Sequence, residues 1–459
     1  MIDNPLIAVA MFFWISYFPI AIQSIYRMLR NRSQFVEKDL RRIHNDPTII
    51  FQITTRSATK TNVVKRGIQS VIESAAAANF KNYEISVVTD DPADERTLKN
   101  FECDTVLVDP AFKTDAIRKG RALQYAMEHR RLRGKHTSKY WIFHMDDESY
   151  VIPQTILSLL KAIREGKSVA SEGPIFYPLK FESANRVAAI AESIRPFTCY
   201  DCVSQMTNPP PVHMHGSNLL VRSDVEDCIG WKFGPVLAED QMFGFKVYET
   251  YGPGSMGWHG GILLEQPPLT LKDHFFQRRR WVLGTLQNLP KFPRWHRIKL
   301  LYRSVTYFLG FASAVSSIAV MAFNYFMIFT MQDYARLTDI FAISDRLSMD
   351  LNNSSGLTLE LLLSLLASAD PVELTIAGVM FFILVVWIGS YQMGLYSNLK
   401  YSKMRWFKKL FYHAQALVLA PLIGLIETFP AFWATLEFVV KRRKLGEKMP
   451  IYDFYIIKK

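Results

Sequence analysis

Cysteine is scarce in this chain. Only four occur among 459 residues: Cys103, Cys199, Cys202 and Cys228. All four fall in a region that the charge pattern below places in the cytoplasm, where thiols stay reduced, so we expect no disulfides. Internal repeats and low-complexity tracts are also absent. That absence counts against a transporter, because transporters usually carry internal repeats and more membrane spans than this chain offers.

Charge is missing altogether from three long apolar runs. They cover 23 residues at 4–26, 29 residues at 304–332 and 26 residues at 374–399. Each exceeds the roughly 20 residues that a helix needs to cross a bilayer. The first run lacks a basic segment before it and a small-residue cleavage site after it. It therefore indicates an uncleaved transmembrane anchor over residues 1–26 rather than a signal peptide.

A fourth apolar stretch, 410–436, is less regular. Pro421, Glu427 and Pro430 interrupt it, and a proline removes a helical hydrogen bond. The stretch either crosses the membrane once or dips in and returns. A single crossing would leave the basic run 441–444 outside, against the preference of Lys and Arg for the cytoplasm. We therefore favour a re-entrant segment, within a membrane region of residues 301–440 that is followed by a basic cytoplasmic tail at 441–459.

Lys and Arg also indicate the orientation of the spans. Five arginines lie between 27 and 42, and four basic residues lie between 294 and 303, which places 27–303 in the cytoplasm. The loop 333–370 holds six acidic residues and two arginines and is expected outside. Residues 27–47 are expected to form a basic helix on the membrane surface.

The net charge of +12 is therefore a membrane signal rather than a nucleic-acid one. We expect an integral multi-pass protein with its soluble part in the cytoplasm. Its membrane would be the plasma membrane in a prokaryote, or the endoplasmic reticulum or Golgi membrane in a eukaryote.

Residues 48–300 alternate between strand and helix patterns. The strand patterns are 48–55, 85–89, 104–108 and 140–145, and the helical patterns between them are 63–78 and 113–133. This alternation predicts an α/β domain with a mostly parallel sheet, whose ligands bind at the carboxyl ends of the strands. Those ends carry Thr55-Arg56, Asp90-Asp91 and Asp146-Asp147-Glu148, where a nucleotide site is expected.

Asp146, Asp147 and Glu148 directly follow the fourth strand pattern. Residues two apart on an extended chain point to the same side, so Asp146 and Glu148 form an acidic pair. Mg²⁺ prefers carboxylate oxygens and shares its other positions with water and substrate phosphates. The alternative is a solvated acidic turn that caps the next helix.

Glu239 and Asp240 precede an apolar helix pattern. An acid at this place can act as a general base if a pocket holds it beside a hydroxyl group. Otherwise it is an acidic residue at a helix N-terminus, where the helix dipole favours negative charge.

The run from Gln277 through Arg278, Arg279 and Arg280 to Trp281 combines guanidinium groups with a flat aromatic ring. Guanidinium binds phosphate through two parallel hydrogen bonds. Basic, tryptophan-containing helices also occur at membrane interfaces without any ligand. Each motif alone is ambiguous, but the three together, in this order and between apolar runs, are far more specific.

In order and content, residues 48–290 resemble the family-2 inverting glycosyltransferases. The chain is most similar to the egghead-type β-1,4-mannosyltransferases, and hyaluronan, chitin and cellulose synthases share the three motifs. The similarity lies in TTR at 54–56, HMDDES at 144–149, AEDQMF at 238–243 and the run from Glu265 through Pro268 and Asp273 to QRRRW at 277–281. The resemblance implies a GT-A-type fold for residues 48–300.

The resemblance also implies a role for each matched position. Asp240 takes the catalytic base position, and Asp146 and Glu148 take the positions that hold Mg²⁺ or Mn²⁺. The nucleotide-sugar positions are matched by Thr54, Arg56, Asp90, Asp91, Lys119, Arg121, Asp146 and Asp147. The diphosphate and acceptor positions are matched by His215, Gly216, Ser217, Glu239, Gln277, Arg280 and Trp281.

The sequence departs from the family pattern in two places. Glu148 stands where aspartate is usual, and Arg56-Ser57 replaces a common Asn-Glu, although that change also fits the egghead-like branch. A separate hypothesis assigns Cys199, Cys202, His213 and His215 to a zinc ion, because cysteine and histidine are both zinc ligands.

These expectations describe a membrane enzyme that moves a sugar, with mannose the first choice, from a GDP- or UDP-sugar donor. The acceptor is a membrane glycolipid or glycan, and the new linkage is β. One alternative is a processive polysaccharide synthase, which extrudes its polymer through its own membrane spans. The few spans of this chain would form only a small channel, so we rank this alternative second. The other is a transporter or channel with a regulatory nucleotide-binding domain, which would leave Asp240 without a chemical role. No nucleic acid is expected as a partner.

Overall fold

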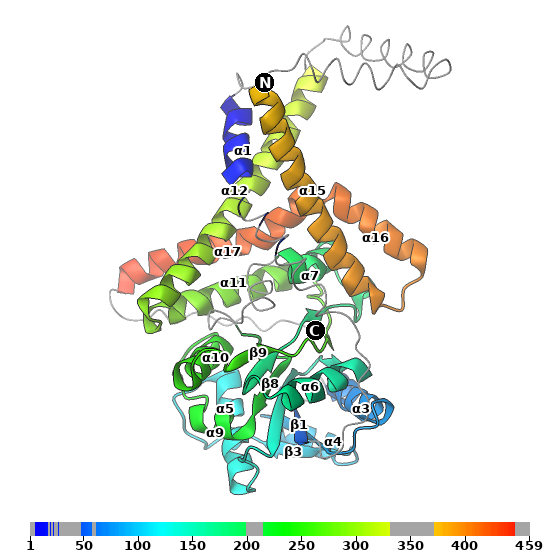
Figure 1. The fold of residues 1–459 in the computed structure, drawn as a ribbon, viewed down its shortest axis with the longest axis vertical. Helices are drawn as coiled ribbons and strands as arrows, with labels where there is room; N and C mark the ends of the chain where they lie inside the picture. The colour runs from blue at the N-terminus through cyan, green and yellow to red at the C-terminus, as the bar shows by residue number, and fades with distance from the viewer. Residues whose placement is uncertain are drawn as a thin grey trace.

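The computed structural model describes residues 5–16, 19, 22, 26, 47–56, 61–198, 214–330 and 371–445. In these residues an α/β domain carries a bundle of long helices (Figure 1). Three expectations lie outside the described residues, namely the surface helix up to residue 46, the loop 333–370, and the tail beyond 445. The same is true of the proposed zinc ligands Cys199, Cys202 and His213.

A seven-stranded sheet forms the centre of the α/β domain. Its strands, in spatial order, are β3 (Asp104–Leu107), β2 (Tyr83–Thr89), β1 (Thr48–Thr54), β4 (Tyr140–Asp146), β8 (Leu219–Arg222), β6 (Ala170–Glu172) and β9 (Met256–Trp258). The first four run parallel, whereas β8 is antiparallel to both β4 and β6. The predicted α/β domain with a mostly parallel sheet is confirmed.

Helices cover both faces of this sheet. β1 is buried along its centre, as a strand covered on both faces must be. Ile49, Phe51 and Ile53 form one core with α3 (Thr61–Ala77) and α6 (Pro153–Glu165). Ile50 belongs to a second core with α5 (Arg118–Leu132), α9 (Ser223–Ile229) and α10 (Glu239–Tyr251). The helix expected from residue 113 begins only at Arg118, because Ile117 keeps an extended backbone.

Shorter elements complete the domain. α4 (Pro92–Leu98) follows β2, and β5 (Tyr150–Val151), β10 (Leu263–Leu264) and β7 (Ile175–Phe176) make a small second sheet. The turns η3 (Phe181–Ser183) and η4 (Leu289–Lys291) flank α7 (Arg186–Thr198) and α11 (Leu271–Asn288). α7 and α11 lie where the domain meets the long helices (Figure 1).

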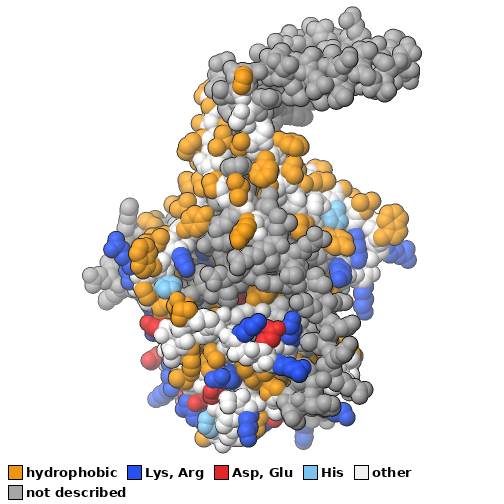
Figure 2. All heavy atoms as spheres, in the orientation of Figure 1, with side chains coloured by type: hydrophobic (Ala, Val, Ile, Leu, Met, Phe, Trp, Pro, Cys, Tyr) orange, Lys and Arg blue, Asp and Glu red, His pale blue; other side chains and the backbone are white. Residues whose placement is uncertain are grey.

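Two long helices, α12 (Arg294–Thr330) and α15 (Pro371–Lys400), rise from the α/β domain, and the short α1 (Pro5–Ser16) packs beside the far half of α12 (Figure 1). The indole N–H of Trp14 on α1 donates to Ser317 Oγ on α12 at 3.0 Å. Side chains such as Met321, Phe381 and Leu384 are exposed, and Figure 2 shows apolar side chains gathered over this end. Among the described residues, Arg294–Phe323, Gly378–Lys400 and Ala420–Lys441 are long and apolar enough to cross a membrane.

The fourth apolar stretch forms two helices, α16 (Trp406–Val418) and α17 (Ala420–Leu445), rather than one segment. Both lie across the base of the bundle, and Pro430 lies inside α17 (Figure 1). One side of α16 is buried through Tyr412 and Ala416, whereas Trp406 and Leu410 are exposed. An apolar side that faces away from the protein is typical of a helix that lies in a membrane interface.

Candidate active site

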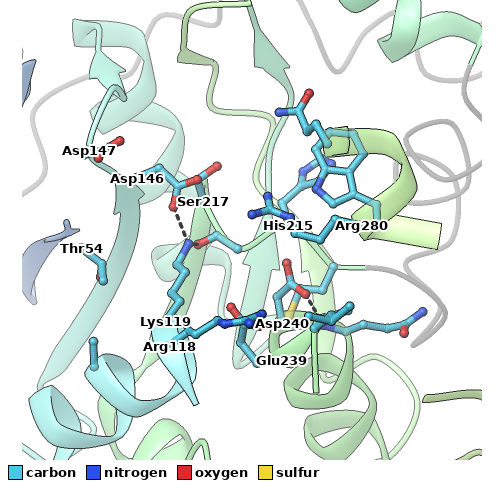
Figure 3. A pocket seen from close by; sticks show the side chains of 18 of the residues that line it. Thr54, Arg118, Lys119, Asp146, Asp147, His215, Ser217, Glu239, Asp240 and Arg280 are labelled. Atoms are coloured by element: carbon cyan, nitrogen blue, oxygen red, sulfur yellow. Dashed lines mark hydrogen bonds and ion pairs between the residues drawn. The ribbon is translucent and has the colours of Figure 1, made fainter. Parts of the chain in front are cut away.

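A cavity of about 430 Å³ opens at the carboxyl ends of β1 and β4. Its walls also include the starts of α5 and α10, the loop 214–217 and one side of α11. Figure 3 shows Thr54, Asp146 and Asp147 on one side of it, with Asp240, His215 and Arg280 on the other. Every site residue predicted from the sequence lines this cavity except Asp91.

The acidic cluster is shaped by a turn directly after β4. The N–H of Ser149 donates to the Asp146 carbonyl at 3.1 Å, and the Asp146 N–H donates to Ser149 Oγ at 3.0 Å. In this geometry, carboxylate oxygens of Asp146, Glu148 and Glu265 lie within 4.8 Å of one another. Burial, together with the charge of Asp146, raises the pKa of Glu265 to about 8. Three carboxylates so arranged are a donor set that suits Mg²⁺ or Mn²⁺.

Lys119 bridges the two sides of the cavity. Its ammonium pairs with Asp146 and donates a hydrogen bond to the Gly216 carbonyl at 2.9 Å. Burial alone would lower the pKa of Lys119, but the negative charges of Asp146, Glu239 and Asp240 outweigh it and raise the pKa. Lys119 therefore stays charged and places one fixed cation between the acidic cluster and Asp240.

The end of the cavity beside β1 and β2 is polar. Arg121 Nη1 lies 3.1 Å from Asp90 Oδ1, and the Thr55 hydroxyl donates to Asp147 Oδ2 at 3.5 Å. Asp91 points elsewhere, because its carboxylate accepts a hydrogen bond from Ala93 N–H at 2.9 Å and caps α4. Of the two adjacent acids, Asp90 is thus the one that can contact a ligand here.

Glu239 and Asp240 occupy the first turn of α10. Burial and the neighbouring charge of Asp240 raise the pKa of Glu239 to about 7, and burial also raises the pKa of Asp240. A carboxylate with a raised pKa accepts a proton more readily, which suits a general base. Asn288 on α11 holds the preceding turn by donating to the Ala238 carbonyl at 2.9 Å.

The loop 214–217 forms the part of the cavity wall next to the start of α10. The His215 N–H donates to Glu172 Oε1 at 2.6 Å, and Glu172 is itself buried. Asn218, which has a left-handed backbone with φ of 58°, donates from its side chain to the carbonyls of Pro174 and Gly261, each at 2.9 Å. These contacts fix His215, Gly216 and Ser217 at the cavity surface.

The five residues from Gln277 to Trp281 divide between two sides of α11. Gln277, Arg280 and Trp281 line the cavity, whereas Arg278 and Arg279 point toward α17. Arg278 hydrogen-bonds to Glu427, and Arg279 hydrogen-bonds to Glu437. Arg278 and Arg279 are therefore buried in ion pairs inside the protein rather than displayed at a membrane surface, whereas Gln277, Arg280 and Trp281 are placed to contact a ligand.

Some lining residues carried no signal as site residues in the sequence. Arg195, Tyr177 and Arg118 are among them. Thr55 also lines the cavity, as its place at the end of the first strand pattern predicts, and so does Glu265. Glu265 begins the run that leads to QRRRW, but no site role is predicted for it there; its place directly after the apolar strand β10 could have indicated one. Arg195 and Tyr177 come from α7 and the segment after β7, where nothing in the local sequence distinguishes them from structural residues.

Solved structures show low global similarity. A mannosyltransferase from Pyrobaculum calidifontis, in complex with GDP-Man and Mn²⁺, aligns with a TM-score of 0.43 and 14% identity over 83% of this chain and 98% of that chain. S. aureus TarS aligns with a TM-score of 0.29 and 11% identity over 87% of this chain and 92% of that chain.

Curated relatives are more informative. The β-1,4-mannosyltransferase egh of Drosophila melanogaster is 24% identical over 250 residues, and bre-3 of Caenorhabditis elegans, also a β-1,4-mannosyltransferase, is 26% identical over 247 residues. Each match covers 52% of this chain and 52% of the relative, so the chain spans about half the length of the curated relatives it matches.

A family model, glycosyl transferase family group 2, matches residues 141–391, which is more than half of the chain. The match takes in the acidic cluster, Asp240 and the five residues that end at Trp281, and it confirms the resemblance seen in the sequence. The chain belongs to the glycosyl transferase family group 2.

Proposed function

We propose that this protein transfers a hexosyl group, with mannose as the favoured sugar, from a nucleotide-sugar donor to a hydroxyl group of a membrane glycolipid or glycan. The observation that carries the proposal is that one cavity holds an acidic cluster and, across Lys119, an aspartate with a raised pKa. The preference for mannose comes from the two β-1,4-mannosyltransferase relatives.

The residues support an inverting displacement. The acceptor hydroxyl attacks the anomeric carbon, its proton passes to Asp240, and the bond from that carbon to the diphosphate oxygen breaks on the opposite face. An α-linked donor then gives a β-linked product. Lys119 and Arg280 are the cations that face the leaving diphosphate, where fixed positive charge stabilises developing negative charge.

Asp146, Glu148 and Glu265 would hold Mg²⁺ or Mn²⁺, since their oxygens form a compact set of hard donors. Such an ion supplies charge stabilisation of the diphosphate when bound. Thr54, Arg56, Asp90 and Arg121 line the far end of the cavity, which suits the nucleoside.

The end of the cavity away from the nucleoside residues is attached to the long helices, which supports a membrane acceptor. Asn398 on α15 accepts from the Tyr177 N–H, and Arg303 on α12 donates to Thr285 Oγ1 at 2.6 Å. Tyr177 and Thr285 both line the cavity. An acceptor held there lies next to the helices that are expected to cross the bilayer, with the donor end in the cytoplasm.

The proposal is tested by offering the full chain, purified into lipid nanodiscs, a panel of GDP- and UDP-sugars with Mn²⁺ and a membrane lipid extract. We expect release of nucleoside diphosphate and labelled lipid from one donor. Binding of a nucleotide without turnover of any donor would contradict the proposal and favour a regulatory nucleotide site.

A further inference from the structure

A buried row of charged side chains joins the cavity to α17. Arg278 donates from Nε to Glu427 Oε2 at 3.0 Å and from Nη2 to Glu427 Oε1 at 2.9 Å. The same Nη2 lies 2.6 Å from Glu192 Oε2, and Glu192 Oε1 accepts from Arg195 Nη1 at 2.8 Å. Two guanidiniums and two carboxylates thus alternate across α17, α11 and α7, and their charges compensate one another.

Both arginines of this row lie against Trp281. The guanidinium carbon of Arg195 is 4.4 Å from the centroid of the indole, and that of Arg278 is 4.6 Å from it. At these distances each cation is attracted to the ring electrons. Arg195 and Trp281 line the cavity, so the row begins at α17 and ends on the cavity wall.

The row has little freedom to rearrange. Glu192 is fully buried and only 5% of Arg278 is exposed. Burial raises the pKa of Glu192, but Arg278 and Arg195 outweigh that effect and hold its pKa at about 2, so Glu192 is ionised. Moving Arg278 away would take the paired arginine from Glu427 and leave Glu192 with Arg195 alone, which is costly in a protein interior.

His274 adds to this packing without adding charge. Its ring nitrogens lie 3.7 Å from Glu192 Oε2 and 3.5 Å from Glu427 Oε1, and burial, with Arg278 beside it, lowers its pKa to about 4. The three residues have the spacing of a metal site. Arg278, however, already supplies positive charge to both carboxylates.

A second ion pair on the same two helices offers a comparison. Arg279 on α11 donates to Glu437 on α17 at 2.7 Å and 2.6 Å, and its side chain is nearly as buried as that of Arg278, with 11% against 6% exposed. Arg279 faces Phe276 rather than Trp281, and neither Arg279 nor Glu437 lines the cavity. Both pairs attach α11 to α17 through two hydrogen bonds, although Glu437 also pairs with Lys441 on its own helix. Only the Arg278 pair reaches the cavity wall.

We propose that Glu427 is a positioning residue for Trp281. Through Arg278, and through Glu192 to Arg195, it sets where the indole stands, so the placement of α17 in the membrane determines the shape of the acceptor end of the cavity. Lys119 and Asp146, which hold the donor end, are not members of this row, so we expect donor binding to be kept. Arg278 also donates from Nη1 to Gln277 Oε1 at 3.1 Å. The inference rests on the proposed function, in which Trp281 contacts the acceptor.

The test compares Glu427→Gln with Glu437→Gln in the full chain in nanodiscs, using a donor that the parent protein turns over. Glu427→Gln should raise the acceptor KM roughly 10-fold, as a misplaced contact does, while the donor Kd stays within about twofold. Glu437→Gln should leave both constants near the parent values. Adding Trp281→Ala to Glu427→Gln should cause little further loss, because both changes remove the same contact.

Three results would overturn the proposal. They are an equal rise of the acceptor KM in both glutamine variants, a change in the donor Kd alone, and fully additive effects of Glu427→Gln and Trp281→Ala. If Glu427→Gln does not fold, Glu427→Asp replaces it, since it keeps the charge and shortens the arm. An acceptor KM unchanged in Glu427→Asp would then overturn it, and a raised one would support it. A parent protein that turns over no donor would instead contradict the proposed function.

Discussion

The α-carbon of Gly216 faces the carboxylate of Asp240 so closely that a β-carbon on it would lie 3.0 Å from Oδ2. The same β-carbon would lie 3.0 Å from Lys119 Nζ. Glycine at this position therefore lets the ammonium and the carboxylate approach one another across the cavity.

Gly216→Ala should accordingly lower turnover. The added methyl group would shift Asp240 or Lys119 by a few tenths of an ångström or more, and misplaced catalytic groups cost roughly 100-fold per ångström. We expect a fall in kcat of about 10-fold or more with an unchanged melting temperature. Gly389→Ala is the control, because nothing lies within 4 Å of a β-carbon there. Equal kcat values in the two variants would contradict this account of Gly216.

The rate should fall as the solution becomes acidic. Transfer needs ionised Asp240, and burial raises the pKa of that group above its ordinary value of 3.8, so the loss should begin at a higher pH than for an exposed aspartate. The charge of Lys119 opposes this shift. Lys119→Met should therefore move the acid limb of kcat/KM to higher pH, whatever its effect on the plateau rate.

The pH profile of Lys135→Met provides the comparison, since Lys135 pairs with Glu84 and does not line the cavity. Its acid limb should coincide with that of the parent. An acid limb that stays in place in Lys119→Met, or moves to lower pH, would show that Asp240 does not set the limb.

Glu265 should contribute to metal binding even though it is distant in sequence from the acidic cluster. We expect Glu265→Gln to weaken Mn²⁺ binding in the presence of GDP or UDP by about 10-fold or more, because the carboxyl of Glu265 can lose its proton when the cation binds, whereas an amide cannot become a charged donor. Electron paramagnetic resonance of free Mn²⁺ measures this directly. Glu165→Gln, at the exposed end of α6, should bind Mn²⁺ like the parent. Identical Mn²⁺ affinities in the parent protein and both variants would exclude Glu265 as a metal ligand.

The arrangement of α16 and α17 leads to a topology prediction. If both lie across the base of the bundle, the chain returns to the cytoplasmic side after α15 and stays there. In a cysteine-free background, single cysteines at position 113 and after Lys459 should be labelled only after permeabilisation. A cysteine at position 352 should be labelled in intact cells. Labelling of the C-terminal cysteine together with position 352 would show that α17 crosses the membrane.

Much of the donor end could be predicted from the sequence because its residues follow strands. Thr54, Asp90 and Asp146 each stand at the carboxyl end of a parallel strand, so local patterns and one rule of sheet topology bring them together. Asp91 was grouped with Asp90 because adjacent residues cannot be separated by a pattern of this kind. Only the cap of α4 distinguishes them.

The acceptor end could be predicted only in part. Helical spacing places Gln277, Arg280 and Trp281 on one side of α11, but it does not show that Arg278 is buried against Glu192 and Glu427. Those partners lie 86 and 149 residues away in the chain. Contacts between such distant elements depend on how the helices pack, and no local pattern records that.

The role of Asp240 is the central claim and can be measured directly. Asp240→Asn keeps the size of the side chain and removes its ability to take a proton. With the best donor and an acceptor in excess, we expect transfer to fall roughly 100- to 10,000-fold while the donor Kd, measured by calorimetry, stays within about threefold of the parent. A variant that transfers sugar within about threefold of the parent rate would contradict the account.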